Sequence, residues 1–195
     1  YEDMPIRTVS DVFERLIFGS EHPLGRTILG PKENIRAFKQ RDFESYHKKH
    51  YTGKNTVVCV AGSFDRAKIL KKIESDFASL PSGEAVSPLP YTDVQTNARV
   101  SVKEKKTDQT QLMLGLPAYP FGHPDEYALE VLTTILGGGM SSRLFTEVRE
   151  KRGLAYSVHA WTDKYPDVGT LVVQAGVEHA KLEKAVSTIL GEFKK

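Results

Sequence analysis

Two strand-like segments near the end of the chain constrain its fold more than any other feature. Residues 155–163 and 169–177 are predicted strands, separated only by a short turn that contains Pro166. Strands joined by so short a connection pair in antiparallel fashion, because a parallel crossover needs a dozen or more residues. A further strand is predicted at 111–116, after an alternation of Val100 and Val102 with polar residues.

Helical periodicity alternates with these strands. Apolar residues spaced by three and four predict helices over about 126–136, 142–151 and 182–193, and three consecutive glycines end the first of them. An antiparallel sheet with its helices gathered on one face is an α+β arrangement. We therefore predict an α+β fold for this part of the chain.

The first eighty residues are mostly helical by the same criterion. An apolar stripe over 9–17 ends at Gly19, and Pro31 suits the first turn of a second, short helix. Asp42 and Asp65 are candidate N-caps of two further helices, the first of them running to about Tyr51.

One apolar run in this region predicts a buried strand. Residues 56–61 are Thr-Val-Val-Cys-Val-Ala, and they contain Cys59, the only cysteine of the chain. We interpret Cys59 as a small buried hydrophobic residue, because a reactive thiolate needs a polar, electropositive neighbourhood that this run does not offer.

Residues 81–97 differ in character from the sequence on either side. Prolines, serines and a glycine recur there, as they do in linkers. We therefore predict a division into residues 1–80, a linker at 81–97 and a second domain at 98–195.

Composition excludes several classes of function. The 195 residues carry a formal net charge of +2, and no stretch concentrates the basic residues. Nucleic-acid-binding arms and polybasic membrane anchors need such concentrations. The apolar runs are also far shorter than the ~20 residues of a membrane-spanning helix. We therefore expect neither a nucleic acid nor a membrane as a partner.

The histidines offer little for a metal. His47 and His50 have the spacing of two ligands on one helix face, but no glutamate between them could act as a base and no third ligand is evident. Their flanks are also basic, which disfavours a bound cation. A solvated helix end is the simpler interpretation, and we predict no metal site in the chain.

The segment 137–158 carries the most informative residues. Arg149 is predicted at a helix end and Tyr156 at the start of a strand, across a turn at Gly153. A guanidinium and a phenol brought together there could both donate hydrogen bonds to a carbonyl oxygen, or to the oxyanion formed when it is attacked. The alternatives are a surface salt bridge for Arg149 and a half-buried strand position for Tyr156. The backbone of Gly137–Gly139 could approach an extended peptide closely.

Residues 136–158, LGGGMSSRLFTEVREKRGLAYSV, resemble the second half of peptidase family M16, which includes pitrilysin, insulin-degrading enzyme and mitochondrial processing peptidase. Residues 43–65, FESYHKKHYTGKNTVVCVAGSFD, look like the end of the family's first half. The segments HPLGRTILG (22–30) and YEDMP (1–5) are similar to bacterial members.

The resemblance implies a LuxS/MPP-like metallohydrolase fold with two homologous α+β halves, of which this chain would hold two partial ones. The family's first half binds zinc through an H-x-x-E-H motif and a distal glutamate. The second half binds no metal and contributes an arginine and a tyrosine to the substrate. Here the matching residues are Arg149 and Tyr156, and Gly137, Gly138 and Gly139 match a glycine-rich loop implicated in substrate handling.

The chain departs from the full pattern because it contains no H-x-x-E-H. By the order of the family's motifs, we expect that motif upstream of Tyr1, so that the chain is a central fragment of a zinc metalloendopeptidase. We expect the fragment alone to bind no catalytic zinc and to cleave nothing. The alternatives are a non-catalytic partner subunit and a structural homologue. The implied substrate is a peptide or unfolded protein, the parent could be a homo- or heterodimer, and its expected compartment is the cytoplasm.

Overall fold

A computed structural model describes residues 3–93 and 95–195. The chain divides into two compact units, one made of the residues up to Thr27 together with Pro90–Lys195, and the other of Ile28–Leu89. The compact units thus join the first 27 residues to the second part of the chain. The predicted division into 1–80, 81–97 and 98–195 separates the two homologous halves that the resemblance implies, not compact units in space, and it stays a prediction.

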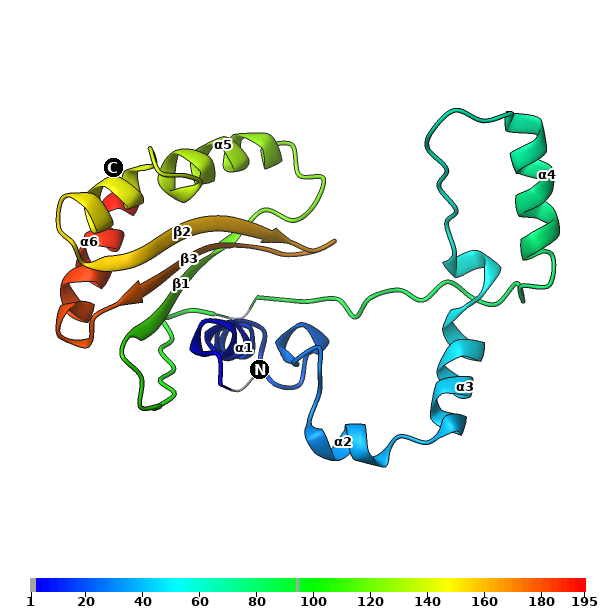
Figure 1. The fold of residues 1–195 in the computed structure, drawn as a ribbon, viewed down its shortest axis with the longest axis horizontal. Helices are drawn as coiled ribbons and strands as arrows, with labels where there is room; N and C mark the ends of the chain where they lie inside the picture. Colours follow the sequence, from blue (N-terminus) through cyan, green and yellow to red (C-terminus); the bar gives the residue numbers. More distant parts are fainter. Residues whose placement is uncertain (1–2, 94) are drawn as a thin grey trace. The chain divides into compact units, whose positions relative to one another are not determined.

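A three-stranded antiparallel sheet organises the first unit (Figure 1). Its strands are β1 (Thr110–Ala118), β2 (Ala155–Lys164) and β3 (Gly169–Val177), in the order β1-β3-β2. The hairpin of β2 and β3 confirms the predicted antiparallel pairing, with Lys164 opposite Gly169 beside the turn. The central position of β3 explains why all its residues except Gln174 are buried, because both faces of this strand are covered.

Three helical elements cover one face of this sheet. They are α5 (Glu126–Gly137), the π-helical segment η3 (Phe145–Glu150) and α6 (Leu182–Phe193), which follows a short 3₁₀ turn η4 (His179–Lys181). Alternate β3 side chains point into this layer and meet apolar side chains of all three helical elements. The core so formed contains Leu136, Leu144, Phe145, Val148, Leu154, Ala155, Val158, Ala160, Leu171, Val173, Ala175, Val177, Ala185 and Ile189.

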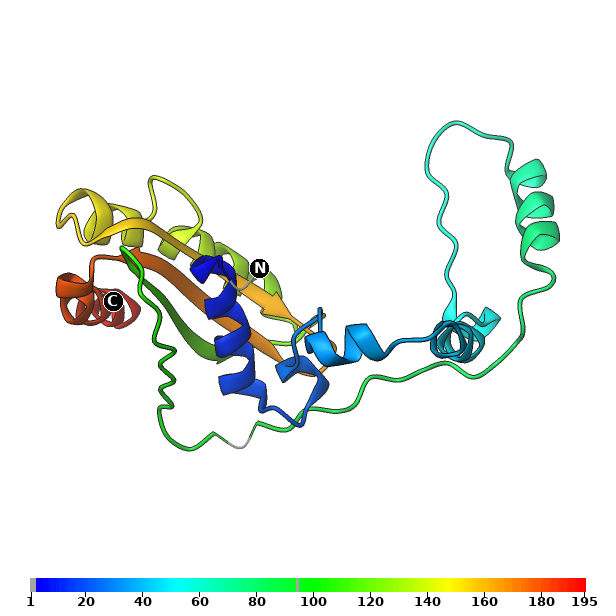
Figure 2. The ribbon, with the colours of Figure 1, turned by 60° about the horizontal axis from the view of Figure 1, so that its bottom comes forward.

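Helix α1 (Pro5–Phe18) lies across the opposite face of the sheet (Figure 2). Its buried Phe13 occupies the space above Gly115 of β1, where a Cβ atom would lie 2.2 Å from the ring. On β3, the side-chain amide of Gln174 donates to the carbonyl oxygen of Ile6 at 2.9 Å. Gly19, with φ of 79°, ends the helix where the apolar stripe predicted.

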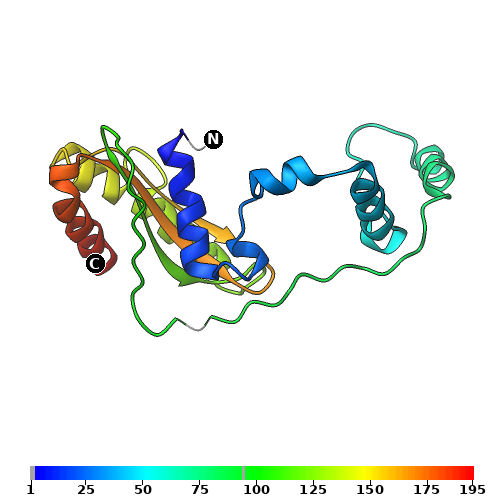
Figure 3. The ribbon, with the colours of Figure 1, turned by 90° about the horizontal axis from the view of Figure 1, so that it is seen from below.

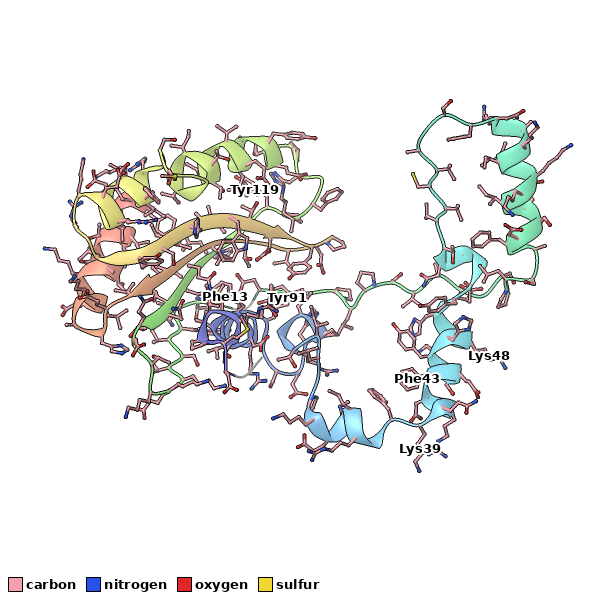
Figure 4. All side chains as sticks on the ribbon, in the orientation of Figure 1. Phe13, Lys39, Phe43, Lys48, Tyr91 and Tyr119 are labelled. Carbon is pink, nitrogen blue, oxygen red and sulfur yellow. The ribbon has the colours of Figure 1, made fainter. Side chains whose placement is uncertain are left out.

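Tyr91 packs against the C-terminal end of α1. The Tyr91 hydroxyl donates to the Ile17 carbonyl oxygen at 3.0 Å, and its ring contacts that of Phe18 edge to face. Figure 4 shows Tyr91 and Phe13 on this side of the unit. A 3₁₀ turn, η1 (Pro23–Gly25), also packs against α1.

The α+β class predicted from the sequence is confirmed, with an antiparallel sheet and with α5, η3 and α6 on one face. One detail before β1 differs. Val100 and Val102 lie in extended backbone outside the sheet, with exposed fractions of 84% and 80%. Alternation alone does not make a strand. The edge strands β1 and β2 pair only with β3, so residues 100–102 have no partner strand in the described sheet.

The second unit consists of short helices (Figure 3). They are α2 (Lys32–Ala37), α3 (Gln40–His50), the 3₁₀ turn η2 (Gly53–Asn55) and α4 (Arg66–Phe77). The backbone of Pro81–Gly83 is held against η2: the Gly53 amide donates to the Pro81 carbonyl oxygen at 2.7 Å. Large apolar side chains stay exposed, including Phe43 on α3 (Figure 4).

Two predictions for this unit are wrong. Thr56–Ala61 is extended but forms no strand, since no strand in the described part of the chain pairs with it, and Cys59 is therefore exposed. Asp42 is not the N-cap of α3. It lies three residues after the cap Lys39, and its carboxylate accepts a hydrogen bond from the Lys39 amide at 2.9 Å. Asp65 does cap α4, as predicted, accepting from the Lys68 amide.

Candidate functional site

The π-helical segment η3 places Arg149 on the surface. Its wider turns are seen in the Lys151 amide, which donates to the Thr146 carbonyl oxygen five residues back at 2.9 Å. Phe145 and Val148 of this segment are buried in the core, whereas Arg149 is exposed. Such π-turns occur most often at functional sites in proteins.

A β-bulge presents Tyr156. The pairing of β2 with β3 shifts between Ala155, opposite Val177, and Ser157, opposite Gly176, so that Tyr156 has no partner. A bulged residue leaves the regular alternation of a strand, and its side chain can be redirected. The Tyr156 side chain is accordingly 74% exposed, although its neighbours Ala155 and Val158 are in the core.

A tight turn connects η3 to β2 and brings the two side chains together. Gly153 has a φ of 55°, a conformation that favours glycine, and its amide donates to the Arg149 carbonyl oxygen at 3.0 Å. The Arg149 guanidinium carbon lies over the Tyr156 ring, 5.5 Å from its centroid. The structure thus brings together the arginine and the tyrosine singled out by the sequence.

Arg149 differs from the other arginines near it. Arg143 donates twice to the buried carboxylate of Glu192, at 2.8 and 3.1 Å, and Arg152 pairs with Glu147. Among the described residues, no hydrogen bond or ion pair engages the Arg149 guanidinium or the Tyr156 hydroxyl. The surface salt bridge considered for Arg149 is therefore not formed here, and the donors of both groups face solvent.

Glu147 of η3, the ion-pair partner of Arg152, has a lowered pKa. Hydrogen bonds from Lys151 and then Arg152 lower the pKa of Glu147 from 4.5 to about 2. Because the folded pKa is depressed, the carboxylate stabilises the fold above pH 4.5, and this contribution is lost as the pH falls towards 2.

This shift makes a testable prediction for Glu147→Gln. The wild-type protein should unfold at a higher temperature than the variant at neutral pH, and the gap should narrow as the pH falls below 4.5. Thermal unfolding of both proteins across this range measures the gap, and the other carboxylates cancel in the difference. A gap that stays constant from pH 7 to pH 2 would contradict the ion pairing.

The three glycines have different environments. Gly137 is the last residue of α5 and is buried against β2, where a Cβ atom would lie 2.5 Å from that of Ala160. Gly138 and Gly139 are exposed beyond the helix end, and Gly139 has open space around its Cα atom. Gly137 thus serves close packing, and only the other two could approach a ligand.

No metal centre is evident in the described residues. Nowhere in 3–93 and 95–195 do three or more His, Cys, Asp or Glu side chains gather closely enough to hold a metal ion. His50 stacks on Tyr46 and His47 on Tyr51, with ring centroids 4.3 and 4.4 Å apart. The residues described here therefore do not fit a zinc site. Within the same ranges, every helix is too short or too polar to cross a bilayer.

One neighbour of the site was missed by the sequence reasoning. The guanidinium carbon of Arg149 lies 4.8 Å from the ring centroid of Phe145, which is only 6% exposed. The sequence does offer one signal for this contact: Phe145 lies four residues before Arg149, and residues four apart are neighbours on the surface of an ordinary helix.

Comparison with known proteins supports a single family. Residues 37–195 match the model of the peptidase M16 inactive domain. An uncharacterized zinc protease of Streptomyces coelicolor is 37% identical over 98% of this chain and 43% of its own length. The uncharacterized zinc protease YmxG of Bacillus subtilis is 35% identical over 97% of this chain and 45% of its own length. The chain thus spans less than half the length of these curated relatives.

Solved structures share the fold. The crystal structure of a peptidase M16 inactive domain from Pseudomonas fluorescens superposes with a TM-score of 0.90, at 25% identity, over 99% of this chain and 47% of that one. A chain of complex III2 from Candida albicans gives a TM-score of 0.83 at 18% identity, over 98% of this chain and 47% of that one, and so shows the fold alone. With the match over residues 37–195, these likenesses show that the chain belongs to peptidase family M16.

Proposed function

We propose that this chain is the substrate-binding, metal-free part of a zinc metalloendopeptidase. In this role Arg149 and Tyr156 donate hydrogen bonds to the carbonyl oxygen of an extended peptide, and more strongly to the oxyanion that forms when the carbonyl is attacked. One observation carries the proposal: an exposed guanidinium lies over the ring of an exposed tyrosine, with no described acid or acceptor using the donors of either group.

Irregular backbone supports this role. A π-helical segment and a bulge each present one of the two residues, and both irregularities occur preferentially beside active sites. The exposed backbone of Gly138 and Gly139 is proposed to approach the same peptide. Gly137 is proposed to act indirectly, by letting α5 pack closely onto β2. A peptide or unfolded protein is the proposed substrate, and a homo- or heterodimer in the cytoplasm the proposed setting.

The metal is proposed to be held outside this chain. The relatives from Streptomyces coelicolor and Bacillus subtilis are named zinc proteases and are more than twice as long as the matched region. The described residues here offer no ligand set of their own. The fragment would then supply donors to the substrate, while zinc and its ligands belong to the rest of the peptidase.

Tyr156→Phe in the zinc-containing peptidase tests the proposal. Loss of one donor to the oxyanion should lower kcat about 100-fold, and zinc content should stay unchanged because Tyr156 is no ligand. Peptide cleavage and metal content are measured on the same preparation. Unchanged kcat would contradict the role of Tyr156, and a loss of zinc would contradict its separation from the metal. A wild-type protein without zinc or activity would favour the partner-subunit alternative.

A further inference from the structure

Two aromatic rings contact the Arg149 guanidinium. The guanidinium carbon lies over the Phe145 ring at 4.8 Å from the centroid and over the Tyr156 ring at 5.5 Å. Both distances are within the ~6 Å over which an aromatic face attracts a cation. The two rings belong to different elements, since Phe145 begins η3 and Tyr156 is the bulge of β2.

The two rings differ in how firmly they are held. Phe145 is 6% exposed and is part of the core with Leu144 and Val148, whereas Tyr156 is 74% exposed. Of the two, only the Phe145 ring is therefore held by packing in the core. An exposed arginine with no ionic partner has several rotamers available, and confining it to one costs conformational entropy. A rigid ring under the guanidinium favours the rotamer in which the guanidinium lies over the Tyr156 ring.

We infer that Phe145 is a positioning residue, which holds the Arg149 guanidinium in its place beside Tyr156. The expected effect of Phe145 on catalysis rests on the proposed function, whereas its expected effect on the position of Arg149 does not. Phe145 lies beneath the guanidinium, so that it acts through Arg149 and does not touch the peptide. Arg143 and Arg152 need no such ring, because carboxylates orient them.

The first test observes the arginine directly. Protons of the Arg149 side chain above the rings should resonate upfield of ordinary arginine values in the NMR spectrum of this chain. Removing the Phe145 ring would abolish its own ring-current shift even if the arginine did not move, so the contact of Arg149 with Tyr156 is the diagnostic signal. Phe145→Leu keeps an apolar side chain in the core and should weaken the nuclear Overhauser effects between the Arg149 side chain and the Tyr156 ring, whereas Phe145→Tyr keeps the ring and should retain them. Phe193→Leu, on the partly buried face of α6, is the matched control and should leave these effects unchanged. Unchanged Overhauser effects in Phe145→Leu would overturn the inference.

The second test measures catalysis in the full peptidase with a double-mutant cycle. Phe145→Leu should lower kcat about tenfold with little change in KM, because a donor displaced by a fraction of an ångström is misplaced for the transition state. In the Arg149→Ala background the same change should have no further effect on kcat. A purely structural role predicts the same loss in both backgrounds, which would overturn the inference.

The outcomes separate this inference from the proposed function. If Arg149→Ala leaves kcat unchanged, the proposed function fails, while the NMR test of Phe145 still stands. If Arg149→Ala lowers kcat and Phe145→Leu does not, the proposed function stands and the positioning role is wrong. Should Phe145→Leu fail to fold, Phe145→Met keeps the side-chain volume without a ring and takes its place in both tests.

Discussion

Replacing Arg149 by alanine is expected to lower kcat about 100- to 1,000-fold in the zinc-containing peptidase. This is the range found when one preorganised donor to a developing oxyanion is removed. Arg149 donates to no described acceptor in the folded protein, so its removal breaks no ion pair and loses only the contacts with two aromatic rings. It should cost about 1 kcal/mol of stability or less and leave zinc content unchanged. The expected loss is in kcat and kcat/KM together, since the interaction strengthens in the transition state.

Arg152→Ala is the matched control for this prediction. Arg152 lies three residues further along, on the same turn, but its guanidinium is engaged by Glu147. Steady-state cleavage of one peptide by both variants, with zinc content measured alongside, is the experiment. An Arg149→Ala enzyme with wild-type kcat, or an equal loss in Arg152→Ala, would contradict the assignment.

The largest expected effect on stability is that of Leu144→Ala. Leu144 is fully buried in the core of the first unit and, with Ile189, is among the largest completely buried side chains of the described residues. Truncating a buried leucine removes its transfer free energy and leaves a cavity, which together cost about 3 kcal/mol. Urea or thermal unfolding of the variant measures this loss.

Leu190→Ala on α6 provides the comparison. Leu190 is 44% exposed, so the same substitution should cost less than about 1 kcal/mol there. Because Leu144 directly precedes η3, its loss also tests whether the segment that carries Arg149 is anchored by this core. Equal destabilisation by the two substitutions would contradict the packing described here.

Elements that pack within the chain were predictable from its sequence. The strands predicted at 155–163 and 169–177 are observed at Ala155–Lys164 and Gly169–Val177, and the helix predicted at 182–193 matches α6. Arg149 and Tyr156 are also together, because a seven-residue separation across the Gly153 turn leaves them little room to part. In each case the residues that decide the structure are close in sequence or in the same hairpin.

The prediction failed where structure depends on a partner or on an irregularity. The run 56–61 has the composition of a buried strand, but a strand needs an edge to pair with, and the described residues provide none for it. The π-turns of η3 and the bulge at Tyr156 add one residue to a regular repeat, which periodicity does not register. The contact of Phe145 with Arg149 was also missed, although their four-residue spacing is a signal for it.

The binding of a phosphonate peptide tests the central claim most directly, because its tetrahedral anionic group imitates the oxyanion. In wild-type and Arg149→Ala peptidase, one measures the dissociation constant of this peptide and the KM of the matching substrate. The account predicts that the dissociation constant rises about as much as kcat/KM falls, 100-fold or more, with a far smaller change in KM. Equal affinity of both enzymes for the phosphonate would show that Arg149 does not stabilise the oxyanion.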